Sequence, residues 1–139
     1  MKSINLEKIK IGDVLPELIT KPITPSTLSL YAEASGDYNP IHLDTKFAND
    51  AGLPNVIAHG MLIMSYLAQS ITNHIDQALI KEYGVKFSSM TNLDDILYCR
   101  GRVTDVSRIG SKVEFELKLS VINQFDDEKL VGFATIKSH

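Results

Sequence analysis

An aspartate and a histidine lie close together on a short segment that is restrained at both ends. Asp37 lies five residues before His42, directly after Gly36 and just before the step Asn39–Pro40. Proline fixes its own φ and pushes the preceding residue towards an extended conformation. Such a loop can hold a carboxylate and an imidazole in one geometry, as proton transfer requires. A neighbouring carboxylate can also orient a histidine ring and stabilise its charged form. The segment therefore predicts acid–base catalysis.

A possible donor for a substrate oxygen follows at His59–Gly60, where a strongly apolar segment begins. We expect a helix to start at Gly60, and the first N–H groups of a helix are unpaired and carry the positive end of its dipole. A residue without a side chain there lets a substrate oxygen approach closely. One such donor is worth about 3 kcal/mol in a transition state. Together with Asp37 and His42, this predicts addition or removal of water beside a thioester carbonyl.

Each of these residues also has a structural interpretation. Asp37 could satisfy backbone N–H groups in a turn, His42 could pack in a loop, and His59–Gly60 could only cap or pack a helix. A metal site is a further alternative, because His42, Asp44 and His59 are ligand types that zinc accepts. No cysteine partner or HExxH pair accompanies them, and Asp44 suits a helix cap, so we expect no metal and no cofactor. The chain has no GxSxG, P-loop or GxGxxG motif.

The elements that must position these residues are helices in the first half of the chain. Thr24 can cap a helix that begins at Pro25, and Gly36 is placed to end it. Asp44 can cap a short helix over 45–51. Residues 60–74 are apolar nearly all round in their first two turns, which predicts a wholly buried helix with Met61 as core.

The second half of the chain is rich in strands. Clean alternation of apolar and polar residues from Val113 to Val121 is typical of a half-buried strand. A long helix followed by consecutive antiparallel strands predicts an α+β fold, with a sheet wrapped around one helix. The expected strands are 79–87, 96–106, 112–123 and 129–137, with a turn and a short strand within 9–19.

Length, composition and charge favour one soluble domain over residues 1–139. The chain is 44% hydrophobic and 22% charged, and its formal net charge of -3 gives no general attraction to nucleic acid or anionic membranes. Cys99 is the only cysteine, which fits a reducing, cytoplasmic setting. We expect no signal peptide and no membrane span.

The segment YAEASGDYNPIHLD, followed by Ala48 and then AGLPNVIAHGMLIM, closely resembles the signature of the MaoC-like dehydratases. These are the R-specific enoyl-CoA hydratases and the (3R)-hydroxyacyl-ACP dehydratases. The strong resemblance covers roughly residues 31–65, and a weaker one extends along most of the chain. It implies a hot-dog fold, in which a curved antiparallel sheet wraps a long central helix. It also implies a dimer of two identical chains, with a higher or heteromeric assembly as the alternative.

The resemblance also implies roles for single residues. The catalytic pair falls on Asp37 and His42, and the asparagine that supports their loop falls on Asn39. The N–H that polarises the thioester carbonyl falls on Gly60, and His59 beside it is assigned to the same substrate-binding position. The pair would add water to a trans-2-enoyl thioester or, in reverse, dehydrate a (3R)-3-hydroxyacyl thioester, which makes the protein a hydro-lyase in fatty-acid metabolism. No cofactor or metal is implied.

One segment departs from the family pattern. Residues 88–97 read SSMTNLDDIL, where many relatives have a turn of the type Pro…Pro-Gly-Asp. In the family this turn can lie near the thioester of the substrate. The departure therefore bears on which substrate binds and leaves the catalytic positions unchanged. Alternative functions are a non-catalytic hot-dog subunit that binds acyl chains and an acyl-CoA thioesterase. The cations that could meet CoA phosphates or an acidic carrier protein are Lys86, Arg100, Arg102 and Lys112; solvated strand faces are the alternative interpretation.

Overall fold

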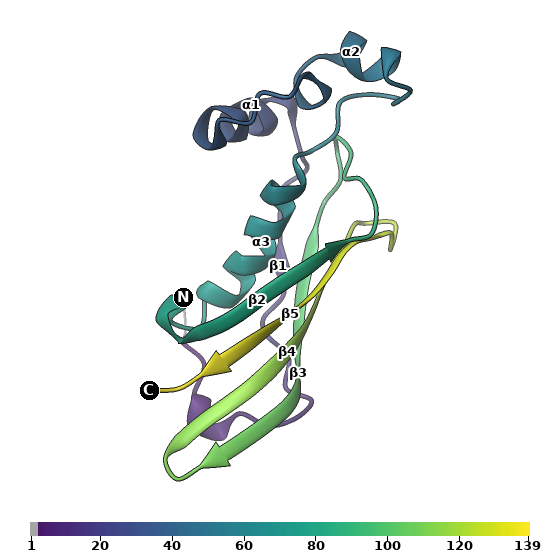
Figure 1. Cartoon of the computed structure of the whole chain (residues 1–139). Helices are drawn as coiled ribbons and strands as arrows, with labels where there is room; N and C mark the ends of the chain where they lie inside the picture. Colours follow the sequence, from purple (N-terminus) through teal and green to yellow (C-terminus); the bar gives the residue numbers. More distant parts are fainter. Residues whose placement is uncertain (1–2) are drawn as a thin grey trace.

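Five antiparallel strands form one curved sheet, seen in a computed structural model that describes residues 3–139 (Figure 1). The spatial order is β1-β3-β4-β5-β2, and every neighbouring pair is antiparallel. The four long predicted strands are confirmed, each within about two or three residues at its ends. The strands are β1 (Leu18–Ile19), β2 (Ile80–Phe87), β3 (Tyr98–Ile109), β4 (Lys112–Ile122) and β5 (Glu128–Lys137).

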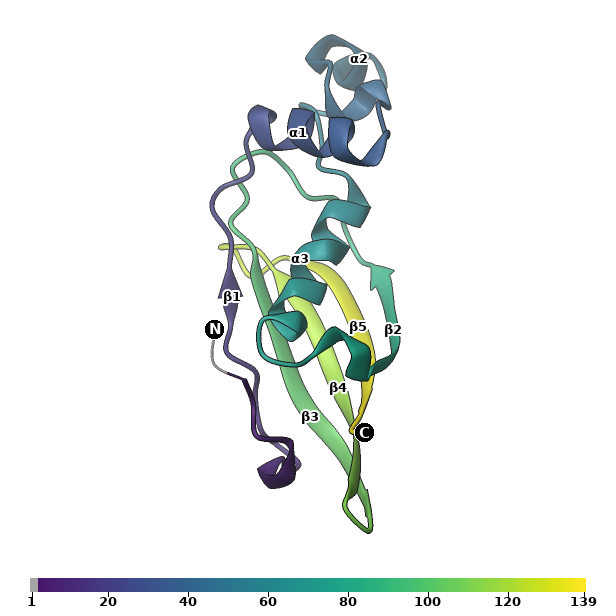
Figure 2. The same cartoon turned by 90° about the vertical axis from the view of Figure 1, so that its left-hand side faces the viewer.

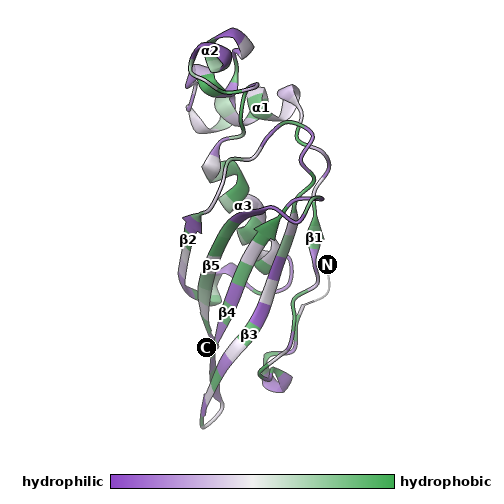
Figure 3. Ribbon diagram, turned by 90° about the vertical axis from the view of Figure 1, so that its right-hand side faces the viewer, coloured by the Kyte–Doolittle hydropathy of each residue, from purple (hydrophilic) through white to green (hydrophobic). Residues whose placement is uncertain are grey.

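Helix α3 (Gly60–Thr72) lies along the inner face of this sheet (Figure 2). Leu67 and Ile71 on the helix are 0% exposed, and the alternating apolar residues of β4 face them from the sheet. Hydrophilic and hydrophobic residues alternate along β3 and β4 when the sheet is viewed from the other side (Figure 3). The predicted architecture, one long helix held by a curved antiparallel sheet, is confirmed.

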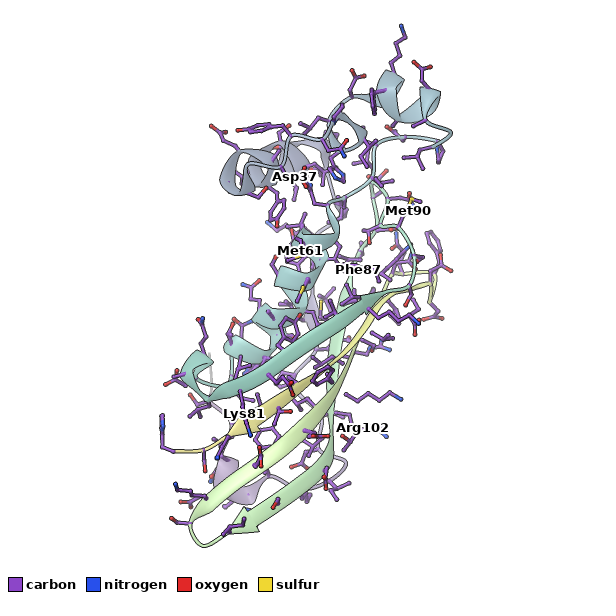
Figure 4. The ribbon with its side chains drawn as sticks, in the orientation of Figure 1. Asp37, Met61, Lys81, Phe87, Met90 and Arg102 are labelled. Atoms are coloured by element: carbon purple, nitrogen blue, oxygen red, sulfur yellow. The ribbon has the colours of Figure 1, made fainter. Side chains whose placement is uncertain are left out.

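The prediction that α3 is wholly buried is wrong for this chain. Met61, expected in the core, is 57% exposed, and Ser65 and Gln69 are also exposed. The sheet covers one side of the helix, and its first turn extends beyond that cover (Figure 4). Part of the apolar surface of this turn is therefore covered by neither the sheet nor the preceding loops.

Two helices, α1 (Pro25–Ser35) and α2 (Thr45–Asp50), lie beyond the start of α3 and outside the sheet (Figure 1). Their predicted ends are confirmed. The Thr24 side chain accepts a hydrogen bond within the first turn of α1, and Gly36 ends that helix with a left-handed φ of 78°. Asp44 caps α2 in the same way as Thr24 caps α1. Three 3₁₀ helices complete the described chain: η1 (Leu6–Lys8), η2 (Pro40–His42) and η3 (Gln77–Leu79).

The unusual segment 88–97 is held by a buried ion pair. Lys129 and Asp95 are 4% and 5% exposed, and their Nζ and Oδ2 atoms are 3.5 Å apart. The Lys129 ammonium also donates to the Met90 carbonyl (2.7 Å), and Asp95 accepts from the Asn92 N–H (2.8 Å). A buried pair with these extra hydrogen bonds fixes the path of a segment that has neither proline nor glycine. No helix among the described residues is long and apolar enough to cross a membrane.

Candidate active site

The loop after α1 is built by successive side-chain hydrogen bonds to its own backbone. Asp37 Oδ1 accepts from the Asn39 N–H (3.1 Å), and Asn39 Oδ1 accepts from the Ile41 N–H (3.2 Å). Pro40 then begins η2, which carries His42 at its end. Asp37 thus fulfils the turn role considered as its structural interpretation. Its carboxylate is exposed and its second oxygen remains available.

His42 is oriented by a backbone carbonyl. Its Nδ1 lies 2.7 Å from the Ile57 oxygen, and because a carbonyl can only accept, Nδ1 carries a proton. In the neutral ring the lone pair is therefore on Nε2, the nitrogen suited to act as a base. The expectation that a carboxylate orients this ring is corrected: the Ile57 carbonyl does so.

His59 lies beneath the loop and is 1% exposed. Its Nε2 is 3.1 Å from the main-chain oxygen of Asp37. Its ring stacks on that of His42 with centres 3.9 Å apart, and meets Tyr31 edge-on with centres 4.8 Å apart. Burial lowers the pKa of His59 below the ordinary 6.5, although the hydrogen bond to Asp37 acts in the opposite direction.

These contacts bring three of the predicted residues together. One oxygen or nitrogen atom from each of Asp37, His42 and His59 lies within 4.8 Å of the others. That separation admits one water molecule between a carboxylate and an imidazole. The set suits a shared metal ion less well, because histidine lone pairs lie in the ring planes and two rings inclined by only 26° direct them past each other.

A cavity of about 340 Å³ opens beside His42 and reaches the start of α3. Gly60 lies on its wall, and no described residue accepts a hydrogen bond from the Gly60 N–H. Asp37 and His59 are not among the lining residues, although a carboxylate oxygen of Asp37 lies within 4.8 Å of a ring nitrogen of His42. The lining residues are His42, Ile57, Ala58, Gly60, Ile63, Phe87, Ser88, Ser89, Met90, Thr91, Lys129 and Leu130.

Several residues of this cavity were not singled out from the sequence. The Phe87 ring covers Gly60 so closely that a Cβ placed there would be 3.0 Å from Phe87 Cε1. Thr91 accepts from the Ala58 N–H (2.8 Å) and so joins segment 88–97 to the strand-like stretch before α3. The departure of this segment from the family pattern was the only sequence signal that pointed here. Phe87 and Met90 lie near the start of α3 in Figure 4.

The four cations that the sequence suggested for phosphate binding do not line this cavity; they are Lys86, Arg100, Arg102 and Lys112. All four are exposed. Arg100 pairs with Glu17, and Arg100 and Arg102 border a separate groove. Arg102 lies well away from Asp37 in Figure 4.

A curved sheet around one helix, with a histidine-lined cavity at the start of that helix, defines a hot-dog domain. The model for the MaoC like domain matches residues 8–125, and the chain belongs to this family. The R-hydratase PhaJ1 from Pseudomonas aeruginosa, in the unliganded form, has a similar structure. Its TM-score is 0.85 at 25% identity, over 96% of this chain and 84% of that one.

Two curated relatives come from Arabidopsis thaliana. A mitochondrial 3-hydroxyacyl-[acyl-carrier-protein] dehydratase is 32% identical over 112 residues, which is 81% of this chain and 65% of the relative. A peroxisomal enoyl-CoA hydratase 2 is 26% identical over 132 residues, which is 93% of this chain and 40% of the relative. The chain thus spans less than two thirds of the length of either.

The lowered pKa of His59 predicts that the protein loses stability in mild acid. In the unfolded chain His59 takes up a proton near its ordinary pKa of 6.5, whereas in the folded chain it stays neutral to lower pH. The unfolded state therefore binds more protons below 6.5, and the free energy of unfolding falls as the pH decreases from there towards the folded pKa.

Urea unfolding of the wild type and of His59→Gln at about pH 7, 6 and 5 measures this effect. The variant lacks the titrating ring, so its free energy of unfolding should fall less steeply with acid than that of the wild type. Equal pH dependence in both proteins would show that His59 takes up its proton as easily folded as unfolded.

Proposed function

We propose that this chain hydrates trans-2-enoyl thioesters, and in reverse dehydrates (3R)-3-hydroxyacyl thioesters, of CoA or of acyl carrier protein. The observation that carries the proposal is the arrangement around one cavity. A histidine with Nε2 unprotonated in its neutral form and a helix-start N–H border the same space, with a carboxylate within 4.8 Å of the histidine. The names of the curated relatives and of the similar structure support the same reaction class.

The proposed reaction begins with a water molecule held between Asp37 and His42. One proton of this water passes to the pair while its oxygen bonds to the β-carbon of the enoyl group. The electrons of the double bond move towards the thioester carbonyl, whose oxygen gains negative charge and accepts from the Gly60 N–H. A proton then passes from the pair to the α-carbon, which restores the pair and completes the 3-hydroxyacyl product.

The dependence on both acid–base residues can be tested with variants that preserve the fold. Asp37→Asn keeps an oxygen that can accept from the Asn39 N–H, and His42→Asn keeps a nitrogen near the Nδ1 position that can donate to Ile57. Each change should lower turnover of crotonyl-CoA, followed by loss of enoyl absorbance, by roughly 100- to 10,000-fold. Asp50→Asn, on the exposed face of α2, is the matched control and should retain full activity.

Full activity in the Asp37 and His42 variants would contradict the proposal. Release of free thiol by the wild type, without a change in enoyl absorbance, would instead indicate a thioesterase. Binding of acyl-CoA with neither change would indicate a non-catalytic subunit.

The role of the Gly60 N–H can be isolated because Gly60 is the first residue of α3. Proline is tolerated at that position, where it removes the N–H without breaking a helix hydrogen bond, and His59 already has the extended ψ of 131° that a residue before proline prefers. Gly60→Ala adds a Cβ against Phe87 but keeps the N–H, so it is the matched control. Gly60→Pro should lower kcat about 100-fold below Gly60→Ala at a similar melting temperature. Equal kcat in the two variants would exclude this N–H as the oxyanion donor.

We also propose that two copies of the chain form a homodimer, in the reducing cytoplasmic setting that a single buried cysteine fits. Strand β2 is the last strand of the sheet and pairs on one side only, with β5. Exposed apolar side chains lie near its end and near the cavity: Met61, Phe87 and Met90 are 57%, 49% and 55% exposed. An unpaired strand edge beside apolar surface suits a two-fold contact that buries both.

Sedimentation equilibrium at micromolar concentration should therefore give the mass of two chains. Met61→Glu places a charge in the proposed contact and should shift the protein towards one chain. Ile109→Glu, at the exposed tip of the β3–β4 hairpin, is the control and should leave the mass unchanged. A wild type that sediments as a single chain would contradict the dimer.

A further inference from the structure

The buried ring of His59 contacts both residues of the proposed acid–base pair without lining the cavity. It is 1% exposed and its ring face covers one face of His42, at 3.9 Å between centres. Its Nε2 approaches the main-chain oxygen of Asp37 at 3.1 Å. Tyr31 of helix α1 also meets the His59 ring edge-on, at 4.8 Å between centres. His59 therefore joins three elements: α1, the loop after it, and the start of α3.

The hydrogen bond to Asp37 fixes which nitrogen of His59 carries the proton. A carbonyl oxygen can only accept, so Nε2 is the donor and Nδ1 of the neutral ring holds a lone pair. Among the described residues Nδ1 has no hydrogen-bond partner, although it is buried. A buried acceptor without a partner is unfavourable, so a residue that only filled space would be better apolar. The Nε2–H group, which donates to Asp37, is what an apolar residue at this position would lack.

Asp37 depends on this donor more than on any other contact from outside its loop. Its other hydrogen bonds are local: its N–H donates to Ser35 Oγ and its Oδ1 accepts from the Asn39 N–H. Within the described chain the bond from His59 is the only hydrogen bond between Asp37 and a residue outside the segment 35–39. Removal of that link frees the main chain that carries the carboxylate.

We propose that His59 is a positioning residue that holds Asp37 through its main-chain carbonyl and His42 through ring stacking, so that both groups reach one water molecule. The inference rests on the proposed hydratase function and adds a role for a residue that the reaction itself does not touch. The lowered pKa of His59 is consistent with it: burial disfavours the charged ring, and a proton on Nδ1 would also face no described acceptor and bring a charge beside His42.

Two amide substitutions separate the positions of the ring nitrogens. In His59→Gln the side-chain nitrogen can occupy the place of Nε2 and donate to Asp37. In His59→Asn the shorter side chain can place it only near Nδ1, where no partner lies. His59→Gln keeps the donor to Asp37 but loses the ring that stacks on His42, so we expect its kcat for crotonyl-CoA to fall by no more than about tenfold. His59→Asn should lose about 100-fold, with KM changed much less, because misplacement by about 1 Å costs that much.

Melting temperatures of the two variants check that both fold. Equal losses of kcat in the Gln and Asn variants, or a loss confined to KM, would overturn the positioning role. A His59→Asn protein that does not fold is replaced by His59→Phe, which keeps the ring and lacks the donor; retained kcat in that variant would also overturn it.

A measurement independent of activity separates this inference from the proposed function. Long-range ¹H–¹⁵N spectra of the histidine rings report which nitrogen is protonated. At about pH 7 we expect His59 of the wild type as the neutral Nε2–H form, because its Nε2 lies beside the Asp37 carbonyl. If the wild type gives these spectra but is inactive on enoyl thioesters, the proposed function is refuted. The contacts of His59 with Asp37 and His42 would still stand. An Nδ1–H form of His59 would refute the positioning role whatever the activity.

Discussion

Burial of His59 between the loop after α1 and the start of α3 is the constraint on which the site depends, because its Nε2 donates to the Asp37 carbonyl and its ring stacks on His42. The consecutive residues His59 and Gly60 then have different tasks. His59 points beneath the loop and holds Asp37, while Gly60 faces the cavity with a free N–H. A shift in the start of α3 would therefore displace the acid–base pair and the proposed oxyanion donor together.

The rest of the fold holds the start of α3 in place. The sheet packs against the buried side of the helix through Leu67 and Ile71, which leaves its axis little freedom. The stretch before the helix is bonded on both sides: the Ile57 carbonyl accepts from His42, and the Ala58 N–H donates to Thr91. The buried Lys129–Asp95 pair fixes the segment that carries Thr91. Rigid positioning of this kind is what an acid–base reaction needs from its scaffold.

The sequence predicted most of the fold because its signals are local. Alternation along β4, the caps at Thr24 and Asp44, and the glycine that ends α1 each report directly on backbone conformation. It also predicted that the loop and the helix start would meet, through the family resemblance. It could not predict the contacts between distant segments that complete the site, namely Ile57 with His42, Phe87 with Gly60 and the buried Lys129. The exposure of Met61 was missed because periodicity cannot show how much of a helix one sheet will cover.

The proposed function requires the cavity beside His42 and Gly60 to add water to one face of an enoyl thioester. The most direct test is chiral analysis of the product that the purified wild type forms from crotonyl-CoA and from a longer trans-2-enoyl-CoA. We expect loss of enoyl absorbance and a 3-hydroxyacyl product of R configuration, in line with the name of the similar R-hydratase PhaJ1. A product of S configuration, or no hydration of either substrate or of the corresponding acyl carrier protein thioesters, would contradict the proposed function.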